Sequence, residues 1–328
     1  MNAGAMAGPA KLSILILNWN RAADTTELLL NLAESAHSEG VSAFEVVILD
    51  NGSDEVAPDW CGLTDLEVKF DRSETNLGYS GGMRRLMQLS TAGYLWFLNN
   101  DARLDPGALS IALELAREER EGVNLPIVLD PDGTMQSRDC HWNAVLGWRS
   151  ERLPLSTGGS PYRLFGDIFV GPLMSRAVCE RIGAFPPQFH TYGEDFDACY
   201  AAAMMRIDVM RIPSLVLRHA KSSSKPKDKI SRFDFDRQAV RNVLASALTN
   251  YRPSGFWAVF LLGLKLMGHE LVWRRRIPSQ ASAWWSWATI PRDAVRLSRD
   301  LGNLRSHRNK NRTRSDAEIW ALRSTVSN

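Results

Sequence analysis

The chain has 328 residues, of which 45% are hydrophobic and 23% are charged, and its formal net charge is +2. This length suits two domains or one domain with an appendage, and the composition is that of an ordinary globular protein that can bury a sizeable core. No internal repeat stands out, and low-complexity sequence is confined to one short stretch of lysine and serine, which excludes a repeat protein.

The cysteines and the first residues indicate the cellular compartment. The four cysteines are Cys61, Cys140, Cys179 and Cys199, and they show neither a C-x-x-C pair nor zinc-finger spacing. We therefore expect free thiols in a reducing cytoplasm. The opening MNAGAMAGPAKLS lacks a basic segment followed by an apolar one, so no signal peptide is expected, and residues 1–10 are predicted to be disordered.

Charge is distributed unevenly along the chain. Residues 1–217 hold 17 Lys/Arg and 29 Asp/Glu, a balance of −12, whereas residues 218–328 hold the other 22 basic and 8 acidic residues, a balance of +14. An acidic front and a basic tail indicate separate roles. The candidate partners of the tail are anionic lipid, nucleic acid or a phosphorylated substrate.

Strands and helices are predicted to alternate over the first 122 residues. Apolar runs rich in branched residues predict strands, and leucines at helical spacing predict helices. In chain order we expect a strand at 12–18, a helix at 21–40, a strand at 44–50, a weaker strand at 66–71, a helix at 80–93, a strand at 94–100 and a helix at 105–122, with Asp105 as N-cap and Pro106 at its first position. This alternation predicts a parallel sheet with right-handed crossovers.

The pattern changes after residue 122. Residues 125–136 predict a strand, a Pro-Asp-Gly turn and a short return, and residues 137–163 are an irregular, candidate mobile loop. Further along we expect a strand at 166–176, a short helix from 177, a helix at 194–207, an extended segment at 209–220, a flexible cationic loop at 221–229, a helix at 233–251 and a very apolar helix at 254–276. The segment SAWWSWATIPRDAVRLSRDL (282–301) follows, and the remainder is expected to be basic and loose.

Polar residues follow each of the first four predicted strands. Ligands of open α/β sheets bind beyond the carboxyl ends of the strands, so these residues are expected at a ligand site. Each cluster alone could be an ordinary turn, and it is their coincidence on one edge that favours a site. The clusters are Asn18-Trp19-Asn20, residues 50–54, Asn76-Leu77-Gly78 and Asn99-Asn100-Asp101.

The fourth cluster suits a divalent cation. The apolar run YLWFL ends on two amides and the carboxylate of Asp101. Mg²⁺ and Mn²⁺ prefer oxygen ligands and usually keep several waters, so a carboxylate with neighbouring amide oxygens can hold such an ion beside a diphosphate. Asp101 is therefore a candidate metal ligand.

Five ordered motifs, ILILNWNR, VVILDNGSDE, NLGYSGG, FLNNDARLDPGAL and YGEDFD, resemble a family 2 glycosyltransferase of the GT-A fold. The nearest branch is that of bacterial rhamnosyltransferase-like and galactofuranosyltransferase-like enzymes. The resemblance implies a Rossmann-like α/β fold with a mixed, mainly parallel sheet flanked by helices. It implies a catalytic domain at 11–230, with a nucleotide-sugar-binding half at 11–122 and an acceptor-binding half at 123–230, followed by a helical, basic, Trp-rich extension at 231–328.

The resemblance also implies which residues meet the sugar donor. They are Asn18 and Asn20 beside the nucleotide, Asp50 at its base or ribose, Asn76, Gly78, Gly81 and Gly82 around the nucleotide-sugar pocket, Asn99 and Asn100 in the metal motif, and Asp167 at the sugar or the acceptor.

A bound Mg²⁺ or Mn²⁺ is a further implication of the resemblance. The run 99–101 matches the family's Asp-x-Asp motif, with Asn99 in place of its first carboxylate, so the metal site is expected to be weaker. The implied metal ligands are Asp101 and His219. For His219 the alternative is a satisfied histidine at a strand end.

The segment HTYGEDFD carries the implied acid–base chemistry. Inverting transfer needs a carboxylate that takes the proton of the acceptor hydroxyl as that oxygen attacks the anomeric carbon. The resemblance makes Asp195 this base, with Glu194 beside it in the acceptor site. Asp197 lies about 200° further round a helix than Asp195 and is assigned a structural role. The alternative is a helix N-terminus enriched in acids because of its dipole.

The tail is predicted to bind a membrane surface. Residues 254–273 are nearly as long as a bilayer span, which takes about 20 residues, but Lys265 and Glu270 argue against a simple span. An interfacial helix fits better, with Arg274–Arg276 at lipid phosphates. We therefore expect a cytoplasmic protein, peripheral on the inner face of the cell membrane. The alternatives are a helix packed on the catalytic domain or a homo-oligomer contact, and nucleic-acid binding is not expected because no motif for it accompanies the charge.

Taken together, these features predict an inverting, metal-dependent glycosyltransferase. The resemblance to the rhamnosyltransferase-like branch implies dTDP-rhamnose or else a UDP-sugar as donor, and a glycan or a polyprenyl-linked glycan of cell-surface polysaccharide as acceptor. A sugar-1-phosphate nucleotidyltransferase is the alternative enzyme, although NWNRAAD replaces the expected Gly-rich loop. A non-catalytic, membrane-associated sugar-nucleotide-binding protein also stays open. The missing G-x-G-x-x-G excludes a nicotinamide-dependent oxidoreductase.

Overall fold

The computed structural model describes residues 11–143, 147–152, 159–220, 229–251 and 289–322. Three predicted segments lie wholly or mostly outside these residues: the disordered N-terminus (1–10), the cationic loop (221–229) and the apolar helix (254–276). Within the described part of the chain, no helix is both long and apolar enough to cross a membrane.

Strands and helices alternate in the first half, as the hydrophobic patterns predict. The described strands are β1 (Leu12–Asn18), β2 (Phe44–Asp50), β3 (Val68–Arg72), β4 (Tyr94–Asn99), β5 (Ala102–Leu104), β6 (Val123–Leu129), β7 (Arg138–Asn143), β8 (Gly147–Arg152), β9 (Tyr162–Leu164), β10 (Leu173–Ser175) and β11 (Val209–His219). The described helices are α1 (Ala22–Glu39), α2 (Gly78–Leu89), α3 (Ala108–Arg117), α4 (Arg176–Ile182), the 3₁₀ helix η1 (Pro187–Phe189), α5 (Glu194–Met204), α6 (Lys229–Asn250), α9 (Ile290–Asp300), α10 (Gly302–Asn311) and α11 (Asp316–Trp320).

The main sheet is mixed and mainly parallel in its first half, which confirms the predicted fold class. Its strand order is β3-β2-β1-β4-β10-β6-β11-β5, and β9 pairs with β11. The pairs β1–β2, β1–β4, β2–β3 and β6–β11 are parallel, whereas β10 runs antiparallel to β4 and β6. The carboxyl ends of β1, β2 and β4 therefore meet at one edge of the sheet.

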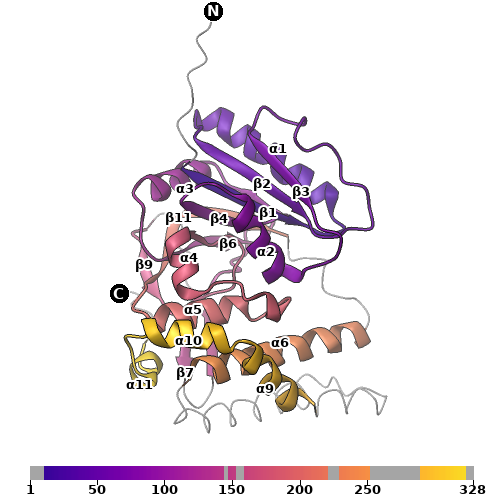
Figure 1. The fold of residues 1–328 in the computed structure, drawn as a ribbon. Coiled ribbons are helices and arrows are strands. Elements are labelled where there is room, and N and C mark those ends of the chain that lie inside the picture. Colours follow the sequence, from indigo (N-terminus) through magenta and orange to yellow (C-terminus); the bar gives the residue numbers. More distant parts are fainter. Residues whose placement is uncertain (1–10, 144–146, 153–158, 221–228, 252–288, 323–328) are drawn as a thin grey trace, which may run out of the picture.

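Helices cover both faces of this sheet (Figure 1). Ile14 and Ile16 of β1 point to the face covered by α1 and α3, where Leu28 is fully buried, and Leu15 points to the opposite face with Met83 of α2. Helices α4, α5, α6 and α9 share this second core. The mostly apolar sequences of β1 and β2 follow from this burial on both faces.

The described C-terminal residues confirm the helical extension expected at 231–328, whereas the loose remainder expected after residue 301 is wrong for the residues up to Trp320. Helices α9, α10 and α11 continue to Trp320, and α9 packs against α6. Arg308 of α10 is completely buried, and its Nη2 atom lies 2.6 Å from Oδ2 of Asp197 in α5. The many basic residues suggested a solvated, unstructured tail. Some of them instead pair with buried acids and backbone carbonyls elsewhere in the fold. The predicted boundaries at 122 and 230 remain predictions.

Three other expectations are wrong in detail. The irregular loop at 137–163 contains the hairpin β7–β8, in which Trp142 is opposite Trp148, and the strand β9. Of the strand expected at 166–176, only β10 forms, and Phe169 and Val170 before it are buried outside any strand. Helix α3 begins after Gly107, which has φ of 85°, and the carboxylate of Asp105 instead pairs with Arg218.

Candidate active site

The ends of β1, β2 and β4 carry a buried polar network. The parallel register places Asn18 opposite Asp50 and Leu17 opposite Asn99. Asn18 donates from Nδ2 to Oδ1 of Asp50 at 3.1 Å, and its Oδ1 accepts from Thr25 at 2.9 Å. The sequence thus correctly predicted that these strand ends meet, because parallel strands present their carboxyl ends to the same edge.

Asp50 lies inside this network. Its side chain is completely buried; Ser53 donates to Oδ1, and Nη1 of Arg72 lies 3.0 Å from Oδ2. In this structure the carboxylate thus orders the loop after β2. Its contact with a base or ribose remains a prediction.

Asn20 and Asn76 hold the neighbouring loops. Asn20 is exposed, has φ of 52°, and accepts at Oδ1 from the backbone of Asp54 at 2.8 Å. Asn76 is also exposed, and its Oδ1 accepts from Gly78 N at 2.7 Å and from Nδ2 of Asn51 at 3.1 Å. Asn51, which belongs to the predicted cluster at 50–54 but was given no role of its own, therefore links the loops after β2 and β3. The D-N-G-S run was the available signal for it.

The glycines at the start of α2 permit close packing. A Cβ atom on Gly78 (φ 73°) would lie 1.7 Å from Nδ1 of His190, and one on Gly82 would lie 2.4 Å from Cδ1 of Leu17. A Cβ on Gly81 would lie 3.0 Å from Cβ of Leu77. Gly78 and Gly82 are thus required for packing of α2, and their approach to a ligand remains a prediction.

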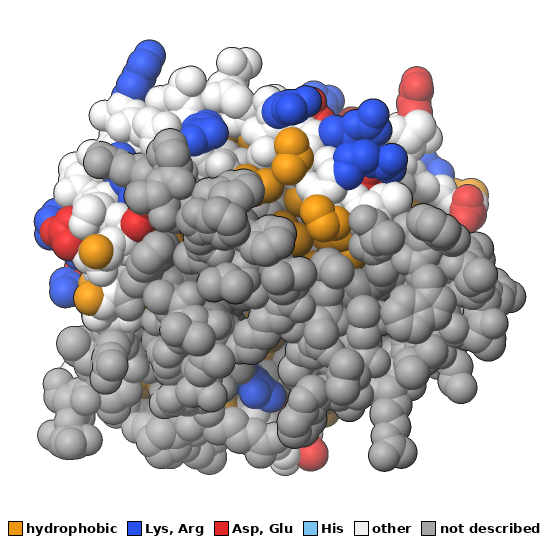
Figure 2. All heavy atoms as spheres, turned by 90° about the horizontal axis from the view of Figure 1, so that it is seen from below, with side chains coloured by type: hydrophobic (Ala, Val, Ile, Leu, Met, Phe, Trp, Pro, Cys, Tyr) orange, Lys and Arg blue, Asp and Glu red, His pale blue; other side chains and the backbone are white. Residues whose placement is uncertain are grey.

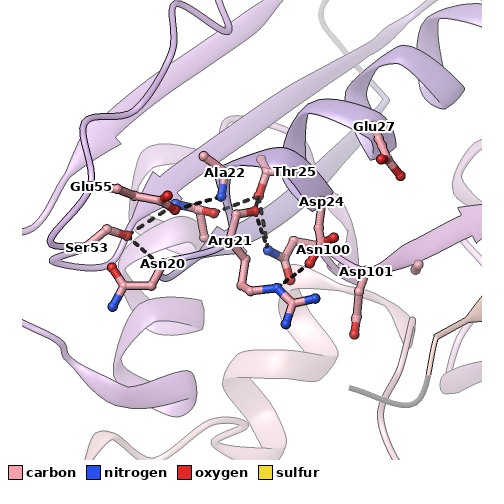
Figure 3. Close-up of polar contacts among 12 residues, drawn as sticks. Asn20, Arg21, Ala22, Asp24, Thr25, Glu27, Ser53, Glu55, Asn100 and Asp101 are labelled. Carbon is pink, nitrogen blue, oxygen red and sulfur yellow. Dashed lines mark hydrogen bonds and ion pairs between the residues drawn. The ribbon is translucent and has the colours of Figure 1, made fainter. Parts of the chain in front are cut away.

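The turn between β4 and β5 presents Asn100 and Asp101 differently. Asn100 donates from Nδ2 to Oγ1 of Thr25 at 3.1 Å, which ties the turn to the start of α1. Figure 3 shows Asn100 turned toward Thr25 and Arg21, whereas the carboxylate of Asp101 points away from these contacts. Asp101 is therefore presented to the rim of the site.

His219 lies beside Asp101. Strand β5 pairs with β11 in a register that places His219 opposite Ala102, and Nε2 of His219 is 3.1 Å from Oδ1 of Asp101. Nδ2 of Asn99 is 3.5 Å from the same Nε2 atom. The structure thus brings together two predicted metal ligands that are 118 residues apart in the chain.

Gln136, which sequence reasoning missed, sets the tautomer of His219. Gln136 donates from Nε2 to Oδ1 of Asp130 at 2.6 Å, so its Oε1 is the atom that accepts from Nδ1 of His219 at 3.1 Å. With the proton on Nδ1, the lone pair of Nε2 faces the carboxylate of Asp101. A histidine that binds a metal through one ring nitrogen usually donates a hydrogen bond from the other ring nitrogen.

Glu194 and Asp195 begin α5, where Glu194 is buried and Asp195 is partly buried. Burial, reinforced by the neighbouring Asp195 charge, raises the pKa of Glu194 to about 8. Burial also raises the pKa of Asp195 to about 6, with a contribution from Asp167. A carboxylate poised near neutral pH suits proton transfer. The alternative of acids that serve only a helix dipole does not account for this burial.

Tyr79 connects the acid pair to the strand ends. Its hydroxyl donates to Oδ1 of Asn99 at 3.4 Å. Burial raises the pKa of Tyr79, and the nearby charges of Glu194 and Asp195 raise it further. Tyr79 was quoted in the NLGYSGG motif but not predicted as a site residue. Its hydroxyl thus contacts Asn99, and its backbone nitrogen donates to Oγ1 of Thr191, three residues before Glu194, so Asn99 and the start of α5 lie in one region.

Asp167 lies near this region, but both of its carboxylate oxygens already accept hydrogen bonds from the protein. Its Oδ2 is 2.6 Å from Nη2 of Arg211 and 2.9 Å from Arg138 N, and both carboxylate and guanidinium are buried. Burial raises the pKa of Asp167 despite the Arg211 charge. In this structure Asp167 is part of a buried ion pair, and its predicted contact with sugar or acceptor remains untested by any ligand.

The residues around Asp101 fit a divalent cation that substrate oxygens help to hold. Among the described residues, no group of three or more His, Cys, Asp or Glu side chains could hold a metal ion. Asp101 and His219 provide two lone-pair donors 3.1 Å apart, an arrangement that a proton or a cation between them stabilises. Mg²⁺ and Mn²⁺ sites in which phosphate and water complete the shell often use this few protein ligands.

Comparisons with known proteins agree with this geometry. A family model described as "Glycosyl transferase family 2" matches residues 13–210. No protein with a curated description matches the chain. Similar solved structures include GalNAc-T7 with UDP, GalNAc and Mn²⁺ (TM-score 0.61, 14% identity, 95% of this chain and 56% of that chain), S. aureus TarS residues 1–349 with UDP-GlcNAc (0.55, 14%, 94% and 89%), and the mannosyltransferase PcManGT from Pyrobaculum calidifontis with GDP-Man and Mn²⁺ (0.52, 15%, 93% and 88%).

These structural similarities show the fold alone, because the identities are low. This chain spans about half the length of the GalNAc-T7 chain. The family match, in contrast, covers more than half of this chain and includes the four strand-end clusters and the acid pair.

Proposed function

This chain belongs to glycosyl transferase family 2, and from that premise we propose that it is an inverting enzyme that takes its sugar from a nucleoside-diphosphate donor. The proposal rests on the observation that the candidate metal ligands and the acid pair lie in one continuous region of the structure. Asp101, His219 and Asn99 lie in contact at the strand ends, and Tyr79 bonds both to Asn99 and to Thr191 in the loop that leads into Glu194 and Asp195.

Asp195 is the proposed base. The acceptor hydroxyl oxygen would form a bond to the anomeric carbon of the donor while the bond from that carbon to the diphosphate oxygen breaks. The proton of the hydroxyl would pass to the carboxylate of Asp195, and the diphosphate would leave with the bonding electrons. Glu194, whose pKa is raised further, would be protonated at neutral pH and could donate a hydrogen bond to the acceptor.

Asp101 and His219 would hold Mg²⁺ or Mn²⁺. When bound, the cation would neutralise charge on the departing diphosphate. The Mn²⁺ named for GalNAc-T7 and PcManGT supports this part of the proposal, as does the hydrogen bond that orients His219 through Gln136. Asn99 supplies an amide where a second carboxylate would add charge, so metal affinity is expected to be modest.

We propose dTDP-rhamnose as donor, with a UDP-sugar next in order, and a glycan or polyprenyl-linked glycan as acceptor. The choice of dTDP-rhamnose as donor follows the resemblance of the sequence motifs to the rhamnosyltransferase-like branch. The nucleotide sugars named for the similar structures, UDP-GlcNAc and GDP-Man, support a nucleotide-sugar donor in general. A cytoplasmic, membrane-peripheral location is part of the same proposal.

A thermal-shift screen with Mn²⁺ present tests the donor, because a ligand of the native state raises apparent stability. We expect dTDP-rhamnose or a UDP-sugar to raise the Tm, and Asp101→Ala to abolish this rise. Asp195→Asn should keep the rise but lose at least about a hundredfold in turnover, as for removal of a general base. Asp208→Asn, an exposed acid paired with Arg163, is the matched control. Full turnover in Asp195→Asn would refute the assigned base.

A further inference from the structure

The loop that leads into the acid pair has an unusual backbone. Between η1 and α5, His190 has φ of 62°, Tyr192 has φ of 70° and Gly193 has φ of 87°. For His190 and Tyr192 this left-handed conformation is unfavourable, and it persists only where the surroundings impose it. The next two residues are Glu194 and Asp195, so whatever imposes the loop conformation also sets the position of the acids.

Helix α6 holds the loop at residues 190–193 in this conformation from one side. Asn242 is completely buried, and its Nδ2 lies 2.8 Å, 2.9 Å and 2.7 Å from the carbonyl oxygens of Phe189, Thr191 and Tyr192. The orientation of this amide follows from its other end, since Oδ1 accepts from Nη2 of Arg241 at 2.8 Å. The two N–H groups of one side chain are thus shared among three carbonyl oxygens of the loop backbone.

Helix α2 holds the same loop from the donor side. Ser80 N donates to the carbonyl oxygen of His190 at 3.0 Å, and Tyr79 N donates to Oγ1 of Thr191 at 3.3 Å. Gly78 leaves room for His190, which no larger residue would. The loop is thus the junction between the predicted nucleotide-sugar pocket and the acid pair.

Asn242 belongs to a buried polar stripe on α6. Asn242, Ser246 and Asn250 are four residues apart, which places them on one helix face, and each is at most 1% exposed. Ser246 and Asn250 bind Oδ1 of Asp197, at 2.6 Å and 3.0 Å, in the first turn of α5. The stripe therefore contacts the backbone before the acid pair and a side chain after it.

We infer that this stripe positions the acid pair, with Asn242 as its principal positioning residue. This inference rests on the proposed function of Glu194 and Asp195. Asn242 does not touch the reacting atoms. It holds the loop that leads into α5, and so it fixes where the two carboxylates at the start of that helix lie.

The test compares Asn242→Ala with Thr249→Val. Thr249 is equally buried in α6, and among the described residues its hydroxyl bonds to the carbonyl of Ala245 within that helix and to no other group. Turnover is measured as nucleoside diphosphate released from dTDP-rhamnose or UDP-GlcNAc. We expect kcat to fall about ten- to a hundredfold in Asn242→Ala because a small misplacement of a catalytic group has that effect. Donor KM should change less than about twofold, and the acid limb of the pH–rate profile should move; Thr249→Val should match the wild type.

Backbone hydrogen exchange provides a readout that does not need activity. Exchange at Ser80 and at residues 190–193 should be faster in Asn242→Ala and unchanged in Thr249→Val. If the wild type releases no diphosphate from either donor, the proposed function fails, and exchange alone decides whether Asn242 holds the loop. Unchanged exchange overturns the inference, and so does unchanged turnover with faster exchange. If Asn242→Ala does not fold, Gln238→Ala, which removes the donor 3.1 Å from Thr191 O, replaces it under the same criteria.

Discussion

Glu194 is a buried acid that pairs with no base among the described residues. Its side chain is 9% exposed, and Oε2 has no hydrogen-bond partner in the part of the chain that the structure describes. A buried carboxyl in this environment retains its proton to higher pH than an exposed one. Glu194 is therefore expected to lower the stability of the fold where the unfolded chain ionises and the folded chain does not.

Replacing Glu194 by Gln should stabilise the protein in a pH-dependent way. Because the folded pKa is raised to about 8, the unfolded state releases a proton from near its ordinary pKa of 4.5 upward, and the free energy of unfolding falls with rising pH until about pH 8. Gln does not titrate, so Glu194→Gln should gain nothing near pH 4.5 and a few degrees of Tm near pH 8. Differential scanning fluorimetry measures this, with exposed Glu34→Gln as control. An equal gain at both pH values would contradict the assigned burial.

At the scale of elements, α10 is joined to α5 and α6 through one buried ion pair. Arg308 binds Asp197 with two nitrogens, at 2.8 Å and 2.6 Å, and also donates to Oδ1 of Asn250 at 2.9 Å. Its Nε donates to the carbonyl of Ile182 at the end of α4. The geometry satisfies both charges, which is the condition under which a buried pair is tolerated.

Arg308→Met should strongly destabilise the fold. The substitution leaves the carboxylate of Asp197 buried without its cation, which costs about 3–5 kcal/mol in comparable cases. Adding Asp197→Asn should recover part of this loss, since residues in direct contact are not additive. Urea unfolding gives the free energies. Arg163→Met, which breaks the exposed pair with Asp208, should cost less than about 1 kcal/mol, and a similar cost for Arg308→Met would rule out the structural role proposed for the pair.

At the scale of the whole molecule, the two parts of the sequence carry opposite net charge, with basic residues concentrated after residue 217. On α9 and α10 the exposed basic side chains are Arg292, Arg296, Arg299, Arg305 and Lys310. Figure 2 views the molecule from the side on which α6 and α9 lie in Figure 1, and basic side chains there lie beside hydrophobic ones on the described surface. This pairing of charge and apolar surface suits a membrane interface.

The protein is expected to float with anionic vesicles and to stay behind with neutral ones. Each Lys or Arg near an anionic surface contributes about 1 kcal/mol, and salt weakens the attraction. Phosphatidylglycerol vesicles at low and high salt, with phosphatidylcholine vesicles as control, measure this by flotation. The triple substitution of Arg292, Arg296 and Arg299 to Glu should reduce the bound fraction severalfold. Failure to float at any salt concentration would remove the membrane from the proposal.

The strand-end clusters were predictable because they depend on local pattern and on one topological rule. Asn18, Asp50 and Asn99 follow apolar runs, and parallel pairing alone brings such ends to one edge. Gln136 and Asn242 were not predictable, since each acts on a residue more than 40 positions away through a contact that no local pattern signals. Asp105 was misassigned because an ion pair with Arg218 replaced its local capping role.

The sequence by itself determined the alternation of strands and helices, the polar edge of the sheet, the acid pair at a helix start and the charge difference between front and tail. These follow from hydrophobic period and residue chemistry, which are local properties. Only the tertiary structure decided that His219 faces Asp101, that Glu194 is held away from water, and that α6 and α10 hold the loop and helix of the acid pair. Those outcomes depend on strand register and on packing between distant segments, and burial acquires its effect on charge only once the chain is folded.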